Sequence, residues 1–212
     1  MAIVVVGGHS RSVGKTSVVA GLIEALAGYC WTAVKITQYG HGICSANGAP
    51  CACATVDHSW AISEEHERSG ESDTSRFLQA GAAHALWVRT EHGRLAEAMP
   101  ALRELIRDLR NVIVESNSVM KFLQPNLYLS VLDPATEDFK NSAREFLDRA
   151  DAVILHAGAG REPEWRKVSL KPVTGRPVFE IIPPRYVTPE IVEFVRSEIA
   201  RAERAESSHR EE

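Results

Sequence analysis

The sequence has no excess of basic residues and no long apolar run. Its 212 residues include 24 lysines and arginines against 28 acidic residues, which gives a formal net charge of -4. Proteins that bind nucleic acids usually carry an excess of basic residues, and this sequence has none, so we expect no nucleic-acid partner. The apolar run at the start, Ala2–Val6, follows no basic segment and leads directly into glycines. We therefore expect neither a signal peptide nor a membrane span.

Cysteine is also scarce, and nothing divides the chain into parts. Four cysteines without a secretory segment predict reduced thiols in a cytoplasmic protein. The sequence contains no internal repeat and no linker, and its length suits a single domain with a substantial core. We expect that domain over residues 1–200. The charged tail, residues 201–212, has too few apolar side chains to pack and is expected to be disordered.

Short β-branched runs alternate with amphipathic stretches along the chain. This alternation predicts an α/β fold, a mostly parallel sheet of about seven strands flanked by helices. The expected strands lie near residues 2–6, 31–37, 85–88, 111–115, 127–132, 152–156 and 177–182. The expected helices cover residues 15–27, 74–80 and 95–109, a stretch from Asp133-Pro134 through Leu147, and the chain from Thr188 onward. The irregular region 38–72 is longer than an ordinary connection, which is typical of functional or disordered loops.

The stretch VVVGGHSRSVGKTSVVAGL, from Val4 to Leu22, contains the strongest functional motif. Gly14-Lys15-Thr16 resembles the end of a phosphate-binding loop (P-loop), and it lies between an apolar strand and an amphipathic helix. The usual spacing, G-x-x-x-x-G-K-[ST], would place a glycine at position 9, where this chain has His9 and its glycine is Gly8. A chance G-K-T is the alternative, but the strand and helix context favours a P-loop.

In a P-loop, successive backbone N–H groups and the helix N-terminus converge on an anion. We predict that Lys15 reaches the β- and γ-phosphates and that the Thr16 hydroxyl binds Mg²⁺. Glu115 ends the buried run VIVE, where a charge is costly unless it is used, so it is the expected metal carboxylate. An ordinary solvated turn residue is the alternative for Glu115. The expected nucleotide-binding residues are Gly8, His9, Ser10, Arg11, Ser12, Val13, Gly14, Lys15, Thr16 and Ser17.

Several motifs resemble known families. The pattern G-x-x-x-x-V-G-K-T resembles that of dethiobiotin synthetase and related members of the signal-recognition/MinD/BioD class of P-loop proteins. GESDTSRFLQAGAAHALWV, from Gly70 to Val88, resembles a segment of the molybdopterin-guanine dinucleotide biosynthesis protein B family. AVKITQYGHG and NVIVES resemble two further segments of that family, although Ser116 stands where the family has glycine. Its members bind GTP and assist cofactor assembly as dimers, which implies a homodimer and a cofactor-biosynthesis enzyme as partner.

The resemblance also implies roles for two side chains. Related enzymes bring a second carboxylate to the metal from the region of Asp73, although capping of the helix over residues 74–80 would explain this aspartate equally well. The same class often points a lysine at phosphate or substrate from the position of Lys35. A surface lysine is the alternative there. The expected catalytic set is Lys15, Lys35 and Glu115, with Thr16, Glu115 and Asp73 around Mg²⁺.

A second group of potential ligands lies in the long region 38–72. Thiolate and imidazole are ligands that Zn²⁺ prefers, and four of them complete a tetrahedral site. The Cys-x-Cys spacing is uncommon for zinc, so a redox disulfide or free thiols stay open as alternatives. The candidate zinc ligands are His41, Cys44, Cys51, Cys53 and His58.

The base of the nucleotide is not specified by any motif. An Asn-Lys-x-Asp guanine-reading motif is absent. EIIPP, from Glu180 to Pro184, resembles a segment that approaches the base through its backbone, so ATP and GTP both stay open. We expect Mg²⁺-dependent binding and slow hydrolysis of one of them, in support of molybdenum-cofactor-type biosynthesis. The alternatives are an ATP-dependent enzyme of the dethiobiotin synthetase type acting on a small carboxylate, and a zinc-binding adaptor with a nucleotide switch.

Overall fold

A continuous apolar run forms the central strand of the sheet. The computed structural model describes residues 2–39, 59–157, 165 and 168–208. In it, β1 (Ala2–Gly8) is buried along its whole length, as expected for a parallel strand covered on both faces. Its neighbours on either side are β5 (Asn111–Glu115) and β6 (Leu127–Leu132), both parallel to it.

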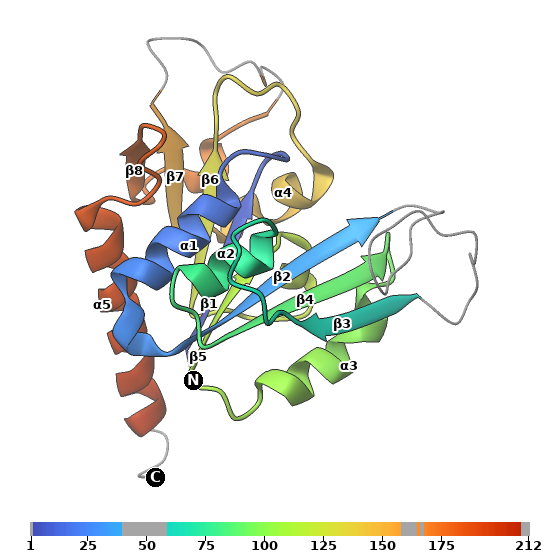
Figure 1. Ribbon diagram of the computed structural model, residues 1–212. Coiled ribbons are helices and arrows are strands. Elements are labelled where there is room, and N and C mark those ends of the chain that lie inside the picture. The colour runs from blue at the N-terminus through green and yellow to red at the C-terminus, as the bar shows by residue number, and fades with distance from the viewer. Residues whose placement is uncertain (1, 40–58, 158–164, 166–167, 209–212) are drawn as a thin grey trace.

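The sheet has eight strands in the order β3-β4-β2-β5-β1-β6-β7-β8 (Figure 1). Among the described residues, seven of these strands run parallel, and only the β3–β4 pair of strands is antiparallel. After β1 the chain forms β2, β3, β4 and β5 on one side of β1. After β5 it crosses to the other side of β1, where it forms β6, β7 and β8. Ligands of such sheets bind outside the carboxyl ends of strands where the direction of winding reverses. The remaining strands are β2 (Trp31–Tyr39), β3 (Trp60–Glu64), β4 (His84–Glu91), β7 (Ala152–His156) and β8 (Val178–Ile181).

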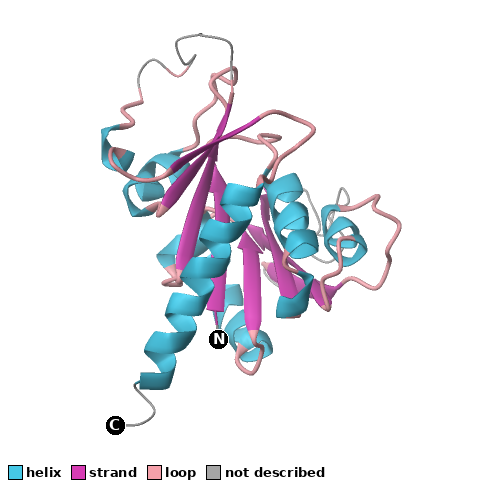
Figure 2. Ribbon diagram, turned by 90° about the vertical axis from the view of Figure 1, so that its left-hand side faces the viewer, coloured by secondary structure: helices cyan, strands magenta, loops and turns pink. Residues whose placement is uncertain are grey.

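Helices cover both faces of the sheet (Figure 2). One apolar core joins the sheet to α1 (Lys15–Ala25), α2 (Asp73–Gln79) and α5 (Pro189–Ser208). The other joins it to α3 (Leu95–Ile106) and α4 (Asn141–Phe146). No helix among the described residues is long and apolar enough to cross a membrane. The prediction of a single-domain, mostly parallel α/β fold is confirmed.

The sequence-based prediction missed one strand. β3 lies within the region 38–72, which was expected to be irregular, and pairs with the edge of β4. An edge strand of this kind does not need apolar side chains on both of its faces. Its ends are exposed and its middle is only half-buried, so it lacks the apolar pattern by which the other strands were predicted.

The helix start expected at Asp133-Pro134 was wrong. Asp133 instead closes a local turn, because its carboxylate accepts from Ala135 N (2.9 Å) and from the Thr136 hydroxyl (3.0 Å). The helix begins only at Asn141, since the backbone between these points bonds to the loop after β1. At the other end of the chain, α5 continues to Ser208, beyond residue 200, where the domain was expected to end.

Candidate functional site

The loop from Gly8 to Gly14 connects β1 to α1 and turns sharply. Ser12 and Gly14 have positive φ angles, 57° and 87°, and turns of this kind direct backbone N–H groups toward a common concavity. Glycine is required at position 14 for a second reason. A Cβ atom there would lie 2.2 Å from Cε1 of Tyr186.

Lys15 lies across this loop at the start of α1. Its Nζ donates to the Ser10 carbonyl oxygen at 2.6 Å. Burial lowers the pKa of Lys15 to about 8, and the neighbouring Lys140 and Lys35 also lower it, while Glu115 opposes the shift. Lys15 is therefore a half-buried cation whose Nζ bonds to a carbonyl oxygen, and a phosphate would supply an anionic partner.

Glu115 and Thr16 meet at the carboxyl end of the central strands. The β1–β5 register places Glu115 beside Val6, one strand away from the loop. Its side chain is only 3% exposed, and Oε2 accepts from the Thr16 hydroxyl at 2.8 Å. A buried carboxylate next to the hydroxyl that follows Lys15 is the pairing that the sequence predicted.

Lys35 and Asp73 complete this group. The Lys35 Nζ lies 2.5 Å from Glu115 Oε1 and 2.8 Å from Asp73 Oδ2, and 3.5 Å from the Thr16 hydroxyl. Burial acts to raise the pKa of Asp73, but the bond and charge of Lys35 outweigh it, so the net shift is downward. Lys35 is thus not a surface lysine, and Asp73 faces the site.

Capping does not explain Asp73. The N-cap of α2 is Ser72, whose hydroxyl accepts from Ser75 N (3.0 Å), while Ser75 Oγ accepts from Ser72 N (2.9 Å). Because Ser72 makes this reciprocal pair, the carboxylate of Asp73, in the first helical turn, is available to Lys35.

His9 occupies the place where the usual spacing has glycine. Its ring is fully buried and lies 5.1 Å from the ring of Phe139 and 4.7 Å from that of Trp165, centroid to centroid. Nδ1 donates to the Asp138 carbonyl oxygen (2.8 Å), and Nε2 accepts from Asp133 N (3.0 Å). Its backbone N–H donates to Val131 O. His9 therefore anchors the loop internally through both ring nitrogens and its backbone.

Several residues near the loop escaped sequence reasoning. Lys140 N donates to the His9 carbonyl oxygen, and burial lowers the pKa of its side chain, with Arg11 adding to the effect. Asp138 accepts from the Ser10 hydroxyl at 2.7 Å. These residues belong to the segment that was mispredicted as helix. No local pattern marks them, since only the fold brings them to the loop.

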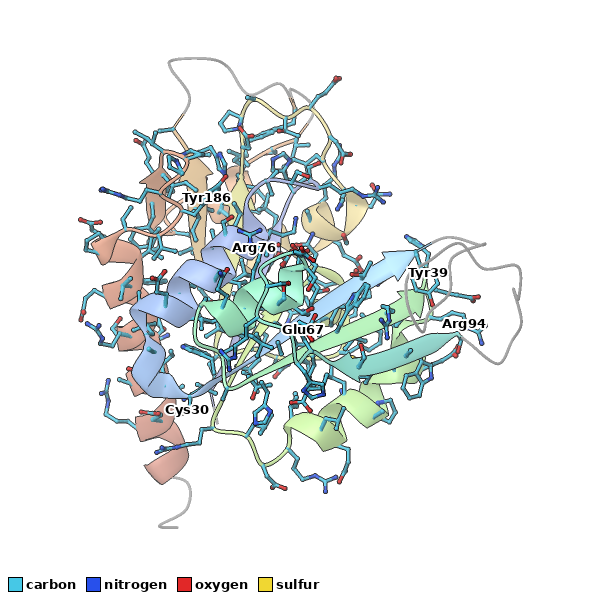
Figure 3. The ribbon with its side chains drawn as sticks, viewed as in Figure 1. Cys30, Tyr39, Glu67, Arg76, Arg94 and Tyr186 are labelled. Atoms are coloured by element: carbon cyan, nitrogen blue, oxygen red, sulfur yellow. The ribbon has the colours of Figure 1, made fainter. Side chains whose placement is uncertain are left out.

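The loop and the first turn of α1 have further supports. The Arg76 guanidinium donates to the Ser17 hydroxyl at 3.2 Å, which ties α2 to α1. His156 Nε2 lies 3.0 Å from the Val13 carbonyl oxygen, and its ring contacts that of Tyr186. Arg76 and Tyr186 both lie near the N-terminal end of α1 (Figure 3).

The candidate zinc ligands His41, Cys44, Cys51, Cys53 and His58 lie outside the described residues. Within the described part of the chain, no group of three or more His, Cys, Asp or Glu side chains is placed to hold a metal ion.

An apolar strand, a glycine-containing loop, a lysine at the helix start and a carboxylate on the adjacent strand form one arrangement. The chain therefore has a mostly parallel α/β fold with the features of a phosphate-binding loop at the end of its central strand. Neither protein-family models nor curated protein sequences gave a match to it.

Three solved structures are similar to the chain. LpxK from Aquifex aeolicus, in complex with ATP, is 18% identical with a TM-score of 0.47, over 85% of this chain and 53% of LpxK, so the chain spans about half of that protein. HypB from Helicobacter pylori, in complex with nickel, is 13% identical with a TM-score of 0.48, over 97% of this chain and 88% of HypB. MobB from Bacillus subtilis is 17% identical with a TM-score of 0.39, over 93% of this chain and 98% of MobB. These likenesses concern the fold alone.

Proposed function

We propose that the protein binds a nucleoside triphosphate with Mg²⁺ and hydrolyses it slowly. The observation that carries the proposal is the convergence of Lys15, Thr16 and Glu115 at one end of β1. Lys15 lies across the Gly8–Gly14 loop, and the Thr16 hydroxyl bonds to Glu115 at 2.8 Å. Phosphoryl transfer mainly requires positioning and charge neutralisation, which such a set supplies.

Each side chain has a distinct role in this proposal. Lys15 and the backbone N–H groups of the loop hold the β- and γ-phosphates. Thr16, Glu115 and Asp73 offer the oxygen ligands that Mg²⁺ prefers, and all three already surround a cation, the Lys35 ammonium. When bound, the metal would neutralise charge on the transferred phosphoryl group.

The finer proposal concerns the biological setting. We infer a homodimer in the cytoplasm that uses GTP or ATP to assist an enzyme of molybdenum-cofactor-type biosynthesis. The resemblance of residues 70–88 to the molybdopterin-guanine dinucleotide biosynthesis protein B family supports this inference. Light scattering of the purified protein would test the dimer, and competition between GTP and ATP would identify the base.

The central test is nucleotide binding by a Lys15→Ala variant. Calorimetry with a non-hydrolysable ATP or GTP analogue and Mg²⁺ should detect binding to the wild type and none to the variant. The matched control is Lys121→Ala, which removes an exposed lysine paired with Glu145 at 3.0 Å. Both variants should melt like the wild type, because Lys15 is not needed for packing. Unchanged affinity in Lys15→Ala would overturn the proposal.

A further inference from the structure

The Lys35 ammonium lies where the oxygen ligands proposed for Mg²⁺ converge. Its Nζ is 2.5 Å from Glu115 Oε1, 2.8 Å from Asp73 Oδ2 and 3.5 Å from Thr16 Oγ1. These are the side chains of three separate elements, β5, α2 and α1. A position that these three oxygens share is therefore filled by a side chain of the protein itself.

We propose that Lys35 is an internal counter-cation that occupies the metal position until a nucleotide draws it away. Mg²⁺ would then bind together with the nucleotide and not before it. This inference rests on the proposed function, because it assumes that Thr16, Glu115 and Asp73 are the metal ligands. Beyond that function, it assigns to Lys35 the role of making the Mg²⁺ affinity depend on bound nucleotide.

Charge explains why the lysine is held there. Glu115 is 3% exposed, and a buried carboxylate without a partner is strongly destabilising. Lys35 neutralises it while also pairing with Asp73, so one ammonium satisfies two carboxylates. In the nucleotide-free protein, the site therefore has no uncompensated pair of carboxylates to attract a divalent cation.

The Lys35 ammonium and Mg²⁺ cannot occupy this position at the same time. Mg²⁺ requires oxygen ligands at about 2.0–2.1 Å in a near-octahedral arrangement. An ammonium within bonding distance of the same oxygens fills that space, and it would repel the metal at short range. Lys35 must move before Mg²⁺ can reach Glu115.

A nucleotide offers Lys35 another partner. Lys35 is already 3.5 Å from the hydroxyl of Thr16, the residue that follows Lys15. A terminal phosphate held by Lys15 would bring anionic oxygens to the same end of α1. The long, flexible lysine side chain, 17% exposed, could then exchange a carboxylate for a phosphate. The vacated carboxylates would be ready for the metal.

The test is metal binding without nucleotide. Mn²⁺, a paramagnetic substitute for Mg²⁺, is titrated into nucleotide-free wild type, Lys35→Met, Lys35→Arg and Lys140→Met, with free Mn²⁺ measured by electron paramagnetic resonance. Lys35→Met should bind Mn²⁺ at least about tenfold more tightly than the wild type, because two close carboxylates lose their cation. Lys35→Arg keeps the charge and should bind as weakly as the wild type.

Lys140→Met removes a nearby cation that acts on Glu115 through its charge, and the Mn²⁺ affinity of this variant should stay within about threefold of the wild type. The proposal is wrong if folded Lys35→Met gains no affinity, or if Lys140→Met gains as much. If Lys35→Met fails to fold, Lys35→Gln replaces it, because glutamine keeps a polar chain able to donate to one carboxylate.

A second titration measures the coupling to nucleotide. Mn²⁺ affinity is compared with and without a saturating non-hydrolysable analogue. The ratio of the Mn²⁺ affinity with the analogue to that without it should be large in the wild type and smaller in Lys35→Met. An equal ratio in the two proteins would contradict the proposed movement of Lys35 from the carboxylates to the phosphate. If the wild type binds no nucleotide, the proposed function fails, whereas the nucleotide-free titration still decides the role of Lys35.

Discussion

The side-chain amide of Asn117 pairs with both backbone groups of Gly8. Gly8 N donates to Asn117 Oδ1, and Asn117 Nδ2 donates to Gly8 O, each at 2.8 Å. The fit is tight, since a Cβ at Gly7 would lie 2.2 Å from Asn117 Oδ1 and 2.6 Å from the hydroxyl of Tyr128. The start of the phosphate loop is thereby fixed to the segment that follows Glu115.

We expect Asn117→Ala to lower both stability and nucleotide affinity. It leaves two buried backbone groups unpaired, each at a cost of about 1–3 kcal/mol, and it frees the start of the loop. Chemical denaturation and calorimetry measure the two effects. The control is Asn126→Ala, which removes a bond to Ile3 N (2.7 Å) at the opposite end of β1. It should lose stability but keep its affinity, and equal affinities in both variants would argue against the role of Asn117.

Glu115→Gln should retain much of the nucleotide affinity and lose Mg²⁺-dependent hydrolysis. The change removes the charge at the metal site but keeps the shape and an oxygen that can accept from Thr16. Turnover is compared with and without Mg²⁺ in the variant and in the wild type. Glu91→Gln, on β4 and away from this group, is the control and should hydrolyse normally. Hydrolysis at the wild-type rate by Glu115→Gln would remove Glu115 from the metal site.

The phosphate loop and the acidic end of β5 were predictable from the sequence because their evidence is local. An apolar run, Gly14-Lys15-Thr16 and an amphipathic helix follow one another directly in the chain. Glu115 stands out because a charge directly follows the apolar run from Val112 to Val114. In a parallel sheet, carboxyl ends meet at one edge, so the two motifs were expected to come together.

The supports of the loop could not be predicted in the same way. Asn117 and Lys140 contact residues more than a hundred positions earlier in the chain, and asparagine and lysine are common in ordinary turns. Asp133-Pro134 is a good helix start by local rules. In the structure, however, the backbone N–H of Asp133 donates to Nε2 of His9. Tertiary contacts outweighed the local preference there.

The cysteine-containing region gives a prediction that depends on the sequence alone. If Cys44, Cys51 and Cys53 bind zinc with His41 or His58, the purified protein should contain about one equivalent of zinc by elemental analysis. A Cys51→Ser, Cys53→Ser double variant should lose the metal but keep nucleotide binding, because neither cysteine is among the expected nucleotide-binding residues. Metal-free wild-type protein with four titratable thiols would rule the zinc site out.

Nucleotide binding should take up protons above pH 8. The pKa of Lys15 is about 8 in the free protein, so much of this lysine is neutral at pH 8.5. A bound phosphate favours the ammonium and raises the pKa, so a proton is taken up and affinity falls as the pH rises past 8. Calorimetry at pH 8.5 in buffers of different ionisation enthalpy measures the uptake. Lys15→Arg stays charged and should show none, and a wild type without uptake would contradict the lowered pKa.

His9 should make the fold sensitive to mild acid. Burial lowers its pKa below the ordinary 6.5, with backbone and carboxylate partners opposing the shift only in part. The unfolded chain therefore binds a proton at a higher pH than the folded protein does. The contribution of neutral His9 to the free energy of unfolding is fully present above pH 6.5. It decreases as the pH falls below 6.5, by up to about 1.4 kcal/mol per pH unit, until the pKa of His9 in the folded state is reached. Protonation would also put a hydrogen on Nε2, which must accept from Asp133 N.

Urea denaturation between pH 7 and pH 5 would measure this loss. His9→Gln cannot titrate, so it should be less stable at pH 7 but should lose less stability on acidification than the wild type. His66→Gln, at an exposed histidine, is the matched control and should follow the wild-type curve. Parallel curves for His9→Gln and wild type would show that His9 is not the titrating group. A smaller slope in His9→Gln alone would assign the acid sensitivity to the histidine that replaces the usual glycine of the phosphate loop.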